Sequence, residues 1–407
     1  MHLVIQLNEA SRDVMREIVA SQVTKPLHAL DVVPDGDLEH HGLDPWVNWL
    51  SFSLGRGLVG HQCYAHGSGV GFNGQFIWDN APPTTRFGLV GVMNVGADLP
   101  RAPVDFFLGD PWTPDAPVQP SSLRSYRDAW GYLAKHYGSL SLLPTARALG
   151  SILQALLTTR WGRRSMAHGA AMLCAIGRVP MSALVFAFYD WTLVEIFMAQ
   201  CRRHKIDRGV VFLNGIAHFQ HSYWDSAAGN NFITRTYRAM MVRLLKGLDV
   251  QRLDILNGLE QQRSGQVFVW RQKDPAAFFR HFFPGLSRRV EQGMTNDTTL
   301  MFDSADDKAR FDTELRRYTV LQQPLLHIED AQDASVSVRV HITQAASSAW
   351  ILRDGQPWVP FEDWFYVYRV RTGEHVKKCY WLSTEAYQMT NPSIAEVGRL
   401  ILGVSSV

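Results

Sequence analysis

The sequence is poor in cysteine, and the four it has lie far apart. Cys63, Cys174, Cys201 and Cys379 form no Cys-x-x-Cys pair in 407 residues. Thiolate zinc sites and disulfide frameworks both depend on cysteines at short or repeated spacings. The pattern therefore disfavours both, and four scattered reduced thiols indicate a cytoplasmic protein rather than a secreted one.

Long apolar runs are also missing. The most apolar region, residues 167–201, is interrupted by Arg178, Pro180, Asp190 and Glu195, whereas a membrane span needs roughly 18 uninterrupted apolar residues. Residues 1–9 have no basic segment and no long apolar segment of the kind that opens a signal peptide. We therefore expect a soluble chain with no membrane span and no signal peptide.

Net charge is almost absent. Forty Lys and Arg stand against 38 Asp and Glu, a formal net charge of +2, so the whole-chain balance does not indicate a surface for polyanions. No nucleic-acid partner is expected. Hydrophobic residues make up 46% of the chain, which is an ordinary globular composition with enough apolar mass for a large core.

Short apolar runs that end in polar residues alternate with helical patterns. Such alternation predicts an α/β fold with a mainly parallel sheet. We expect strands at residues 3–7, 89–93, 210–213 and 253–261, short strands at 298–302 and 335–342, and a strand or loop at 364–375. We expect helices after Ser11 and at 45–55, 233–248, 276–283 and 306–318, loop at 98–121, and a helical insertion at 122–203 that covers one side of the sheet.

The strand predicted at residues 210–213 ends in Asn214, and His218 and His221 follow within seven residues. Ligands of open α/β sheets bind outside the carboxyl ends of the strands. Histidines there can hold a metal, bind substrate or transfer protons near neutral pH. Alternatively, both are helix-start histidines whose hydrogen bonds go to backbone carbonyls and water.

Other strand ends carry polar residues that could converge on the same place. Asn8 and Glu9 follow the first strand, and Glu260 and Gln261 end a later one. A surface glutamate beside a helix start, or an asparagine in an Asx turn, would be an equally ordinary reading.

The helix expected from Pro45 offers free N–H groups to an anion, since helix N-termini bind anions readily. Asp44 is read as its N-cap. Trp46 and Trp49 fit helix packing, and Ser51 and Ser53 show no base partner in the sequence. The histidines at 40, 41 and 61 read as loop residues that could line a pocket.

The order of these motifs resembles the alkaline phosphatase superfamily, in particular its type I phosphodiesterase/nucleotide pyrophosphatase-like branch. The resemblance covers most of the chain outside the helical insertion and parts of residues 284–360. The segments that carry it are Leu7-Asn8-Glu9, Pro45 to Trp49, Gly60-His61, Asn214-Gly-Ile-Ala-His218, Asn257-Gly-Leu-Glu-Gln261 and Thr372-Gly-Glu-His375.

The resemblance implies a three-layer α/β/α sandwich, a single domain over residues 1–407 that contains the insertion at 122–203. It also implies a two-metal site, from which this sequence departs. Asn8 and Asn214 stand where the superfamily has metal-binding aspartates, and Pro45 falls at the position of the nucleophile. Neutral carboxamides bind zinc poorly, and a normal two-zinc site needs several carboxylates and imidazoles.

We therefore expect a reduced site with one divalent metal, Zn or Mn, or with none. The expected metal ligands are His218 and His375, and the expected catalytic residues are His218, His221 and Glu9. The residues expected to bind substrate are Asn8, Trp46, Asn48, Asn214 and Glu260.

The implied reaction is hydrolysis or transfer at a phosphate, phosphodiester or sulfate-type group of a small anionic substrate. Water or an acceptor hydroxyl would attack, because no nucleophilic side chain stands at Pro45. The alternative is a non-hydrolytic, metal-free member that acts as a binding protein or as a biosynthetic enzyme of different chemistry. A homodimer is left open.

Overall fold

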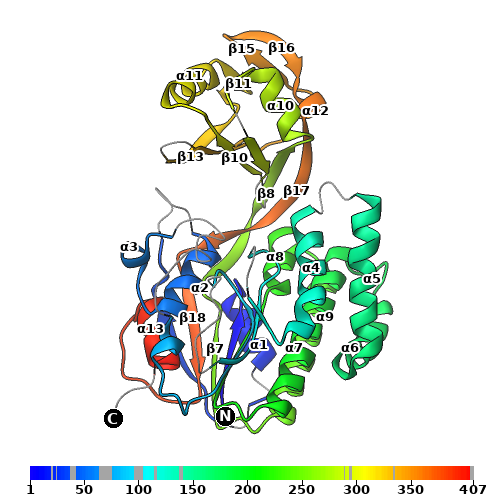
Figure 1. Cartoon of the computed structure of the whole chain (residues 1–407), viewed down its shortest axis with the longest axis vertical. Helices are drawn as coiled ribbons and strands as arrows, with labels where there is room; N and C mark the ends of the chain where they lie inside the picture. The colour runs from blue at the N-terminus through cyan, green and yellow to red at the C-terminus, as the bar shows by residue number, and fades with distance from the viewer. Residues whose placement is uncertain are drawn as a thin grey trace. The chain divides into compact units, whose positions relative to one another are not determined.

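The chain forms two compact units, Met1–Arg263 with Gly373–Val407 and Ser264–Thr372 (Figure 1). The computed structural model describes residues 1–19, 22–23, 25–36, 43–63, 76–95, 104–113, 117–136, 141–287, 289–292, 296–332 and 335–403. The histidines at 40 and 41 lie outside these ranges. We expected a single domain over residues 1–407 and did not recognise the second unit in the sequence. The expectation of a single domain stays a prediction.

The larger unit is built on an eight-stranded sheet with the strand order β2-β18-β7-β1-β6-β3-β4-β5. Its strands are β1 (His2–Leu7), β2 (His28–Val32), β3 (Phe87–Val92), β4 (Val104–Gly109), β5 (Val118–Gln119), β6 (Arg208–Leu213), β7 (Arg252–Leu256) and β18 (Cys379–Ser383). The strands from β7 to β4 run parallel, and β2, β18 and β5 are antiparallel to their neighbours. The mainly parallel sheet is therefore confirmed.

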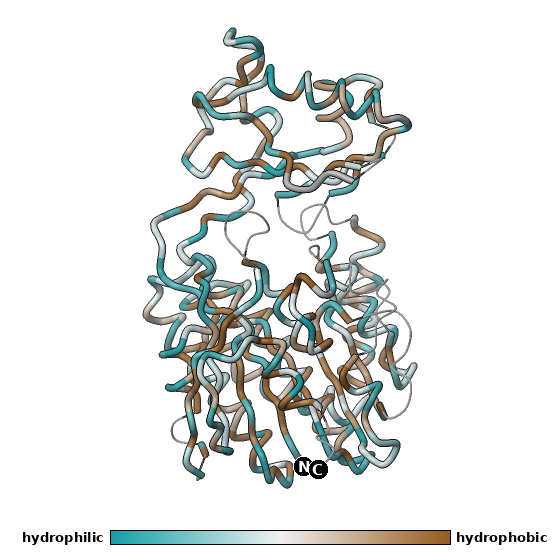
Figure 2. Tube along the Cα trace, turned by 90° about the vertical axis from the view of Figure 1, so that its left-hand side faces the viewer, coloured by the Kyte–Doolittle hydropathy of each residue, from teal (hydrophilic) through white to brown (hydrophobic). Residues whose placement is uncertain are grey.

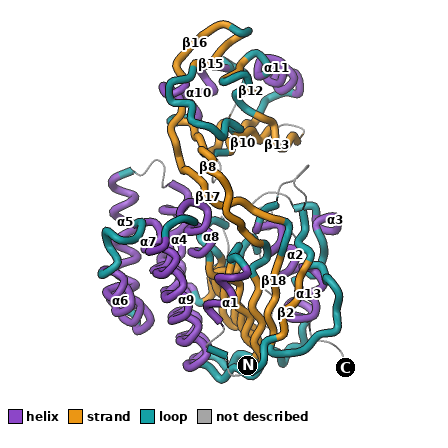
Figure 3. The backbone as a smooth tube through the Cα atoms, turned by 180° about the vertical axis from the view of Figure 1, so that it is seen from behind, coloured by secondary structure: helices purple, strands orange, loops and turns teal. Residues whose placement is uncertain are grey.

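Helices cover both faces of this sheet (Figure 3). In β1 the side chains of Leu3, Ile5 and Leu7 belong to one hydrophobic cluster and Val4 belongs to another. The first cluster draws on α1 (Arg12–Val19) and on the helices from α4 to α9, and the second on α2 (Pro45–Leu54) and α13 (Ile394–Leu402). Because successive residues of a strand point to opposite faces, the pattern makes three layers.

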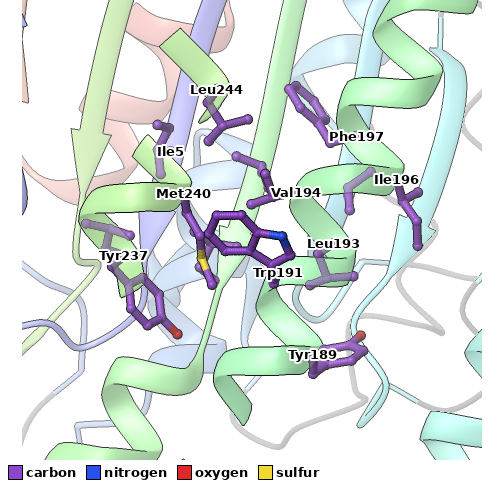
Figure 4. Packing of buried hydrophobic residues seen from close by; sticks show 14 of the residues in the cluster. Ile5, Tyr189, Trp191, Leu193, Val194, Ile196, Phe197, Tyr237, Met240 and Leu244 are labelled. Atoms are coloured by element: carbon purple, nitrogen blue, oxygen red, sulfur yellow. The ribbon is translucent and has the colours of Figure 1, made fainter. Parts of the chain in front are cut away.

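The expected helical insertion is present. It comprises α4 (Arg124–His136), α5 (Leu142–Thr158), α6 (Arg160–Leu173) and α7 (Met181–Arg203). Helix α7 packs on β3 and β6 and against α9 (Ala227–Gly247), and α6 packs on α7. Figure 4 shows side chains of α7 and α9, including Val194 and Met240, gathered beside Ile5 of β1.

Helix α7 is long and apolar enough to cross a membrane by length and composition, and 72% of its apolar window is buried inside the structure. A core helix of a globular protein has the same properties. Figure 2 colours each residue by hydropathy and shows brown, hydrophobic stretches in both units.

Two expectations about local structure were wrong. Residues 98–121 were expected to be loop, yet they contain β4 and β5; the many prolines flank β4 without entering it. Residues 253–261 were expected to be one strand, but β7 ends at Leu256 and β8 (Glu260–Gln272) begins after a turn. Gly258 allows this turn, since its φ is +69° and a Cβ there would lie 2.5 Å from the ring of Trp49.

The smaller unit has its own core of aromatic and aliphatic side chains, which includes Trp270, Phe278, Phe283 and Phe311. Two four-stranded antiparallel sheets run in the orders β13-β14-β10-β9 and β12-β11-β15-β16. Their strands are β9 (Arg289–Gln292), β10 (Asp297–Met301), β11 (Tyr318–Val320), β12 (Gln323–Pro324), β13 (His327–Gln332), β14 (Ser335–Arg339), β15 (Trp350–Arg353) and β16 (Gln356–Pro360), and its helices are α10 (Pro275–Phe282), α11 (Ala305–Leu315) and α12 (Phe361–Trp364). The chain leaves the larger unit in β8 and re-enters it in β17 (Phe365–Val376), which pairs with β8.

Candidate functional site

Glu9, His221 and His375 meet in the larger unit, where one carboxylate oxygen and two imidazole nitrogens lie within 4.8 Å of one another. We call these three residues the Glu-His-His cluster. Oε2 of Glu9 is 2.9 Å from Nε2 of His221 and 2.9 Å from Nε2 of His375, and the two imidazole centroids are 5.0 Å apart. Glu9 and His221 are buried, and His375 is half-buried.

Three elements bring the cluster together. Glu9 follows the end of β1, and its φ of +54° turns the chain away from the strand direction. The N–H of Glu9 donates to the carbonyl of Asn257 after β7, and the N–H of Asn8 donates to the carbonyl of Leu213 at the end of β6. The cluster thus lies at the carboxyl ends of three adjacent parallel strands, where ligands of such sheets bind.

The other two members come from α8 (Gly215–Tyr223) and from β17. Gly373 lets β17 approach α8, because a Cβ at this position would lie 2.5 Å from the carbonyl oxygen of Gln220. A side chain at 373 would therefore push away the strand that carries His375.

Both ring nitrogens of His375 face oxygen atoms. Nδ1 lies 2.6 Å from the carbonyl oxygen of Leu43, and Nε2 faces the carboxylate of Glu9. A carbonyl oxygen only accepts hydrogen bonds, so Nδ1 carries a proton. Without a cation, Nε2 must also be protonated to bond an ionised carboxylate; with a cation between them, its lone pair is free for ligation.

The environment of Glu9 keeps it ionised. Burial would raise the pKa of its carboxyl group, but the charges and hydrogen bonds of His375 and His221 outweigh burial and hold the pKa well below its ordinary value. Gln261 Nε2 donates to Oε2, and Asn8 Nδ2 donates to Oε1 over 3.1 Å. Sequence reasoning placed Gln261 at a strand end but gave it no role.

This donor set fits one divalent cation of the zinc or manganese type. Two imidazoles and one carboxylate are a common catalytic ligand set that leaves positions open for water and substrate. The bond from His375 Nδ1–H to a backbone carbonyl is the usual device that orients a ligating imidazole. The cluster can thus hold the metal that the resemblance implies, with His221 and Glu9 beside His375.

Asn8 and Asn214 form a hydrogen-bonded chain that runs past the cluster. Trp49 Nε1 donates to Asn8 Oδ1 over 2.6 Å, Asn8 Nδ2 donates to Asn214 Oδ1 over 2.7 Å, and Asn214 Nδ2 lies 3.3 Å from His218 Nε2. Both carboxamide oxygens already accept a hydrogen bond from protein. The two asparagines are therefore hydrogen-bonded to each other and to neighbouring side chains of the protein.

His218 is not a member of the Glu-His-His cluster. Its imidazole stacks on Phe186, with centroids 3.7 Å apart, and on Trp112, with centroids 5.2 Å apart. The structure therefore separates the two histidines of α8. Metal ligation by His218 stays a prediction, whereas His221 and Glu9, expected to be catalytic, join His375 in the group that could hold a metal.

Three other residues expected to bind substrate make intramolecular contacts. Asn48 is fully buried, accepts from the N–H of Asp35 and donates to the carbonyl of Asp44. The Trp46 carbonyl accepts from Asn94, and Glu260 accepts from the N–H of Arg12 at the start of α1. Their contacts with substrate stay predictions.

Solved structures of two hydrolases match almost the whole chain. The phosphonoacetate hydrolase of Sinorhizobium meliloti in complex with phosphonoformate is 10% identical, with 98% of this chain and 94% of that chain covered and a TM-score of 0.42. Murine ectonucleotide pyrophosphatase/phosphodiesterase 5 is 9% identical, with 100% and 96% covered and a TM-score of 0.43. The likeness is one of fold alone. No family model and no curated protein matches the sequence.

Ser51 has a histidine partner that the sequence did not reveal. Its Oγ lies 2.8 Å from Nε2 of His61, and both residues are buried. Nδ1 of His61 accepts from the N–H of Cys63, and burial lowers the pKa of His61 against the opposing charge of Asp35. A neutral imidazole that accepts at Nδ1 carries its proton on Nε2, so it donates to Ser51 and is no base for it.

Ser51→Ala is therefore expected to keep the turnover rate within about twofold while lowering the free energy of unfolding by about 1–3 kcal/mol, since a buried N–H loses its acceptor. Steady-state kinetics and urea unfolding would measure the two effects. A rate loss of a hundredfold or more with an intact fold would instead make Ser51 a nucleophile.

Asp190 stabilises the start of α8 by accepting a hydrogen bond from its backbone. In the sequence, Asp190 was noted only because it interrupts the apolar region at residues 167–201. Asp190 Oδ2 accepts from the N–H of Gly215 over 2.8 Å and from the hydroxyl of Tyr237. Burial raises the pKa of Asp190 to about 6, although these hydrogen bonds oppose the rise. A side chain at position 215 would displace the Tyr237 hydroxyl, because a Cβ there would lie 2.4 Å from it.

Asp190→Asn is expected to stabilise the protein at pH 8 but not at pH 4. A carboxyl group whose pKa is raised by folding contributes stability below its ordinary pKa, and loses it as pH rises through the folded value near 6. The carboxamide keeps an acceptor oxygen without that loss, so the expected gain at pH 8 is about 1–3 kcal/mol.

Urea unfolding at both pH values would measure this difference, with the exposed Asp225→Asn as control. If Asp190→Asn changes the free energy of unfolding equally at pH 4 and pH 8, the pKa of Asp190 is not raised by folding.

Proposed function

We propose that this protein hydrolyses or transfers a phosphate, phosphodiester or sulfate-type ester of a small anionic substrate, with a single divalent cation held by Glu9, His221 and His375. The observation that carries the proposal is the Glu-His-His cluster at the carboxyl ends of three parallel strands. The superfamily resemblance of the sequence supports the reaction class, and the paired amides of Asn8 and Asn214 support a site with one metal.

A cation bound there would polarise an ester oxygen and lower the pKa of a water molecule. Glu9, His221 and His375 would bind it. Gln261 fixes the rotamer of Glu9 through Oε2, and the Leu43 carbonyl fixes the ring of His375.

The start of α2 lies beside the cluster, because Leu43, which contacts His375, precedes Pro45 by two residues. The first N–H groups of a helix have no intrahelical acceptor, and its dipole favours negative charge. We assign these N–H groups, from Trp46 onwards, to the oxygen atoms of the substrate. Pro45 supplies no nucleophile, so water or an acceptor hydroxyl attacks.

The test combines metal analysis with a substrate screen. Protein purified without added metal, then loaded with zinc or manganese, is expected to bind one equivalent and to turn over p-nitrophenyl phosphate, a bis(p-nitrophenyl) phosphodiester or a p-nitrophenyl sulfate. A chelator should abolish the turnover, and metal should restore it. Absence of both metal and turnover in the parent would reject the proposal, as would metal content and turnover that His375→Ala leaves unchanged.

A second candidate is a metal-free binding protein or an enzyme of different chemistry. The observation that favours it is that Glu9 already receives hydrogen bonds from His221, His375, Gln261 and Asn8, so its carboxylate is satisfied without a cation. Under this alternative, zinc would not change the unfolding temperature of the purified protein.

A further inference from the structure

Exposed apolar side chains gather on the helical insertion. Sixteen large hydrophobic side chains are exposed in the part of the chain that the structure describes, and nine of them lie between residues 142 and 185. We call these nine the apolar patch: Leu142, Leu143, Leu149, Leu153, Leu157, Leu173, Ile176, Met181 and Val185. Isolated exposed hydrophobic residues are ordinary, but a group of this size marks an interaction surface.

Helix α5 forms the centre of the patch and is apolar on two sides. Ala148, Ile152 and Leu156 are buried, where α5 packs against α4 and α6. On the adjoining face, Leu142, Leu149, Leu153 and Leu157 follow each other at spacings of seven, four and four residues, which places them along one stripe of the helix. Leu142 is 90% exposed and the other three are each more than half exposed.

The helix that carries this face lies on the outside of the larger unit. Helix α7 packs on the sheet, α6 packs on α7, and α5 packs on α6 and α4. Figures 1 and 3, which view the molecule from opposite sides, both show α5 and α6 at the edge of the unit. Leu149, Leu153 and Leu157 of α5 therefore point away from the core of their own unit.

The sequence interval that contains the patch carries charged residues of one sign only. Between Asp128 and Asp190 the sequence contains no Asp or Glu and six basic residues: Lys135, Arg147, Arg160, Arg163, Arg164 and Arg178. Two acidic residues that flank this interval in the sequence are paired, since Asp128 contacts Arg127, and the buried Glu195 is bound by Arg243 and lies 4.0 Å from Arg164. Arg147, Arg160 and Arg178 are exposed.

We propose that the apolar patch docks on the surface of an anionic phospholipid bilayer, with the α5 leucines in the lipid and the arginines on the headgroups. A second copy of this chain is a poor occupant, because it would bring a second excess of positive charge against the first. An anionic bilayer satisfies both features: aliphatic side chains enter the headgroup boundary, and basic residues are attracted to its negative potential. The docking does not depend on the activity proposed above.

Co-sedimentation with lipid vesicles tests this docking. The full chain is expected to bind vesicles that contain about one third phosphatidylglycerol at least tenfold more strongly than pure phosphatidylcholine vesicles, and to dissociate as NaCl screens the charges. Leu149→Ser with Leu153→Ser should lower binding about tenfold or more, since two leucines leave the lipid. Arg147→Gln with Arg160→Gln should weaken binding to anionic vesicles only.

The matched control is Val59→Ser with Met301→Ser, two exposed apolar positions outside the patch, which should bind like the parent. Circular dichroism would verify that each variant is folded. Failure of the parent to bind either vesicle would overturn the proposal, as would binding that the leucine variant leaves unchanged. Self-association of the parent in sedimentation velocity that the leucine variant abolishes would instead make the patch a dimer interface.

Discussion

Glu9→Gln is expected to lower metal affinity at least a hundredfold and turnover about a thousandfold, with little change in fold. Loss of groups that merely orient ligands already costs about 10–100-fold in metal affinity, and Glu9 is the only carboxylate in the Glu-His-His cluster. Glutamine has the same shape and keeps an acceptor oxygen for one histidine, so the change removes the charge rather than the packing.

The matched control is Glu374→Gln. Glu374 stands next to His375 in the chain, but its carboxylate is exposed and accepts from Gln262. Metal content after dialysis, isothermal titration with zinc and steady-state kinetics would measure the effect in both variants. Equal metal content and equal rates in Glu9→Gln and the parent would remove Glu9 from the site.

The double variant Asn8→Asp/Asn214→Asp is expected to lose about 3–5 kcal/mol of unfolding free energy without metal and to recover it with zinc. The two side chains are buried, 2.7 Å apart, and Asn8 lies 3.1 Å from the Glu9 carboxylate. Buried charges without partners cost energy of this size. With zinc present, the new carboxylates become ligands, and the bound metal should rise from one equivalent to two.

Asn48→Asp serves as the control for a buried charge outside the site, because Asn48 is also fully buried. The Asn48→Asp variant should have a lower free energy of unfolding than the parent both with and without zinc. Urea unfolding in chelator and in zinc, together with metal analysis, would separate the two cases. If the double variant binds no more zinc than the parent, the asparagine pair is not a lost metal site.

Local sequence patterns predicted much of the larger unit. The apolar runs at residues 3–7 and 210–213 form β1 and β6. Helix α2 begins at Pro45 and ends before Gly55, as expected for a helix at residues 45–55. The smaller unit was not recognised, since its strands are short and its core forms from aromatic residues spread over residues 270–365. Short apolar runs alone do not indicate which sheet they join.

The net charge of the whole chain, which is close to zero, does not reveal the local excess of basic residues on the helical insertion. The interval without Asp or Glu between Asp128 and Asp190 is nevertheless visible in the sequence. The exposure of the α5 leucines was not, because Leu153 and Leu156 have the same residue type and only packing against α4 and α6 distinguishes them.

The sequence by itself predicted a site at the carboxyl ends of the strands and a metal set that departs from two zinc ions, because polar residues follow the strands and Asn8 and Asn214 are not aspartates. Only the tertiary structure decided which side chains converge. His218 and His221 are one helical turn apart and equivalent by spacing, yet His221 reaches Glu9 while His218 stacks on Phe186. Glu9 and His375 meet across 366 positions of sequence, because β17 pairs with β8, and β8 follows β7, the neighbour of β1 in the large sheet.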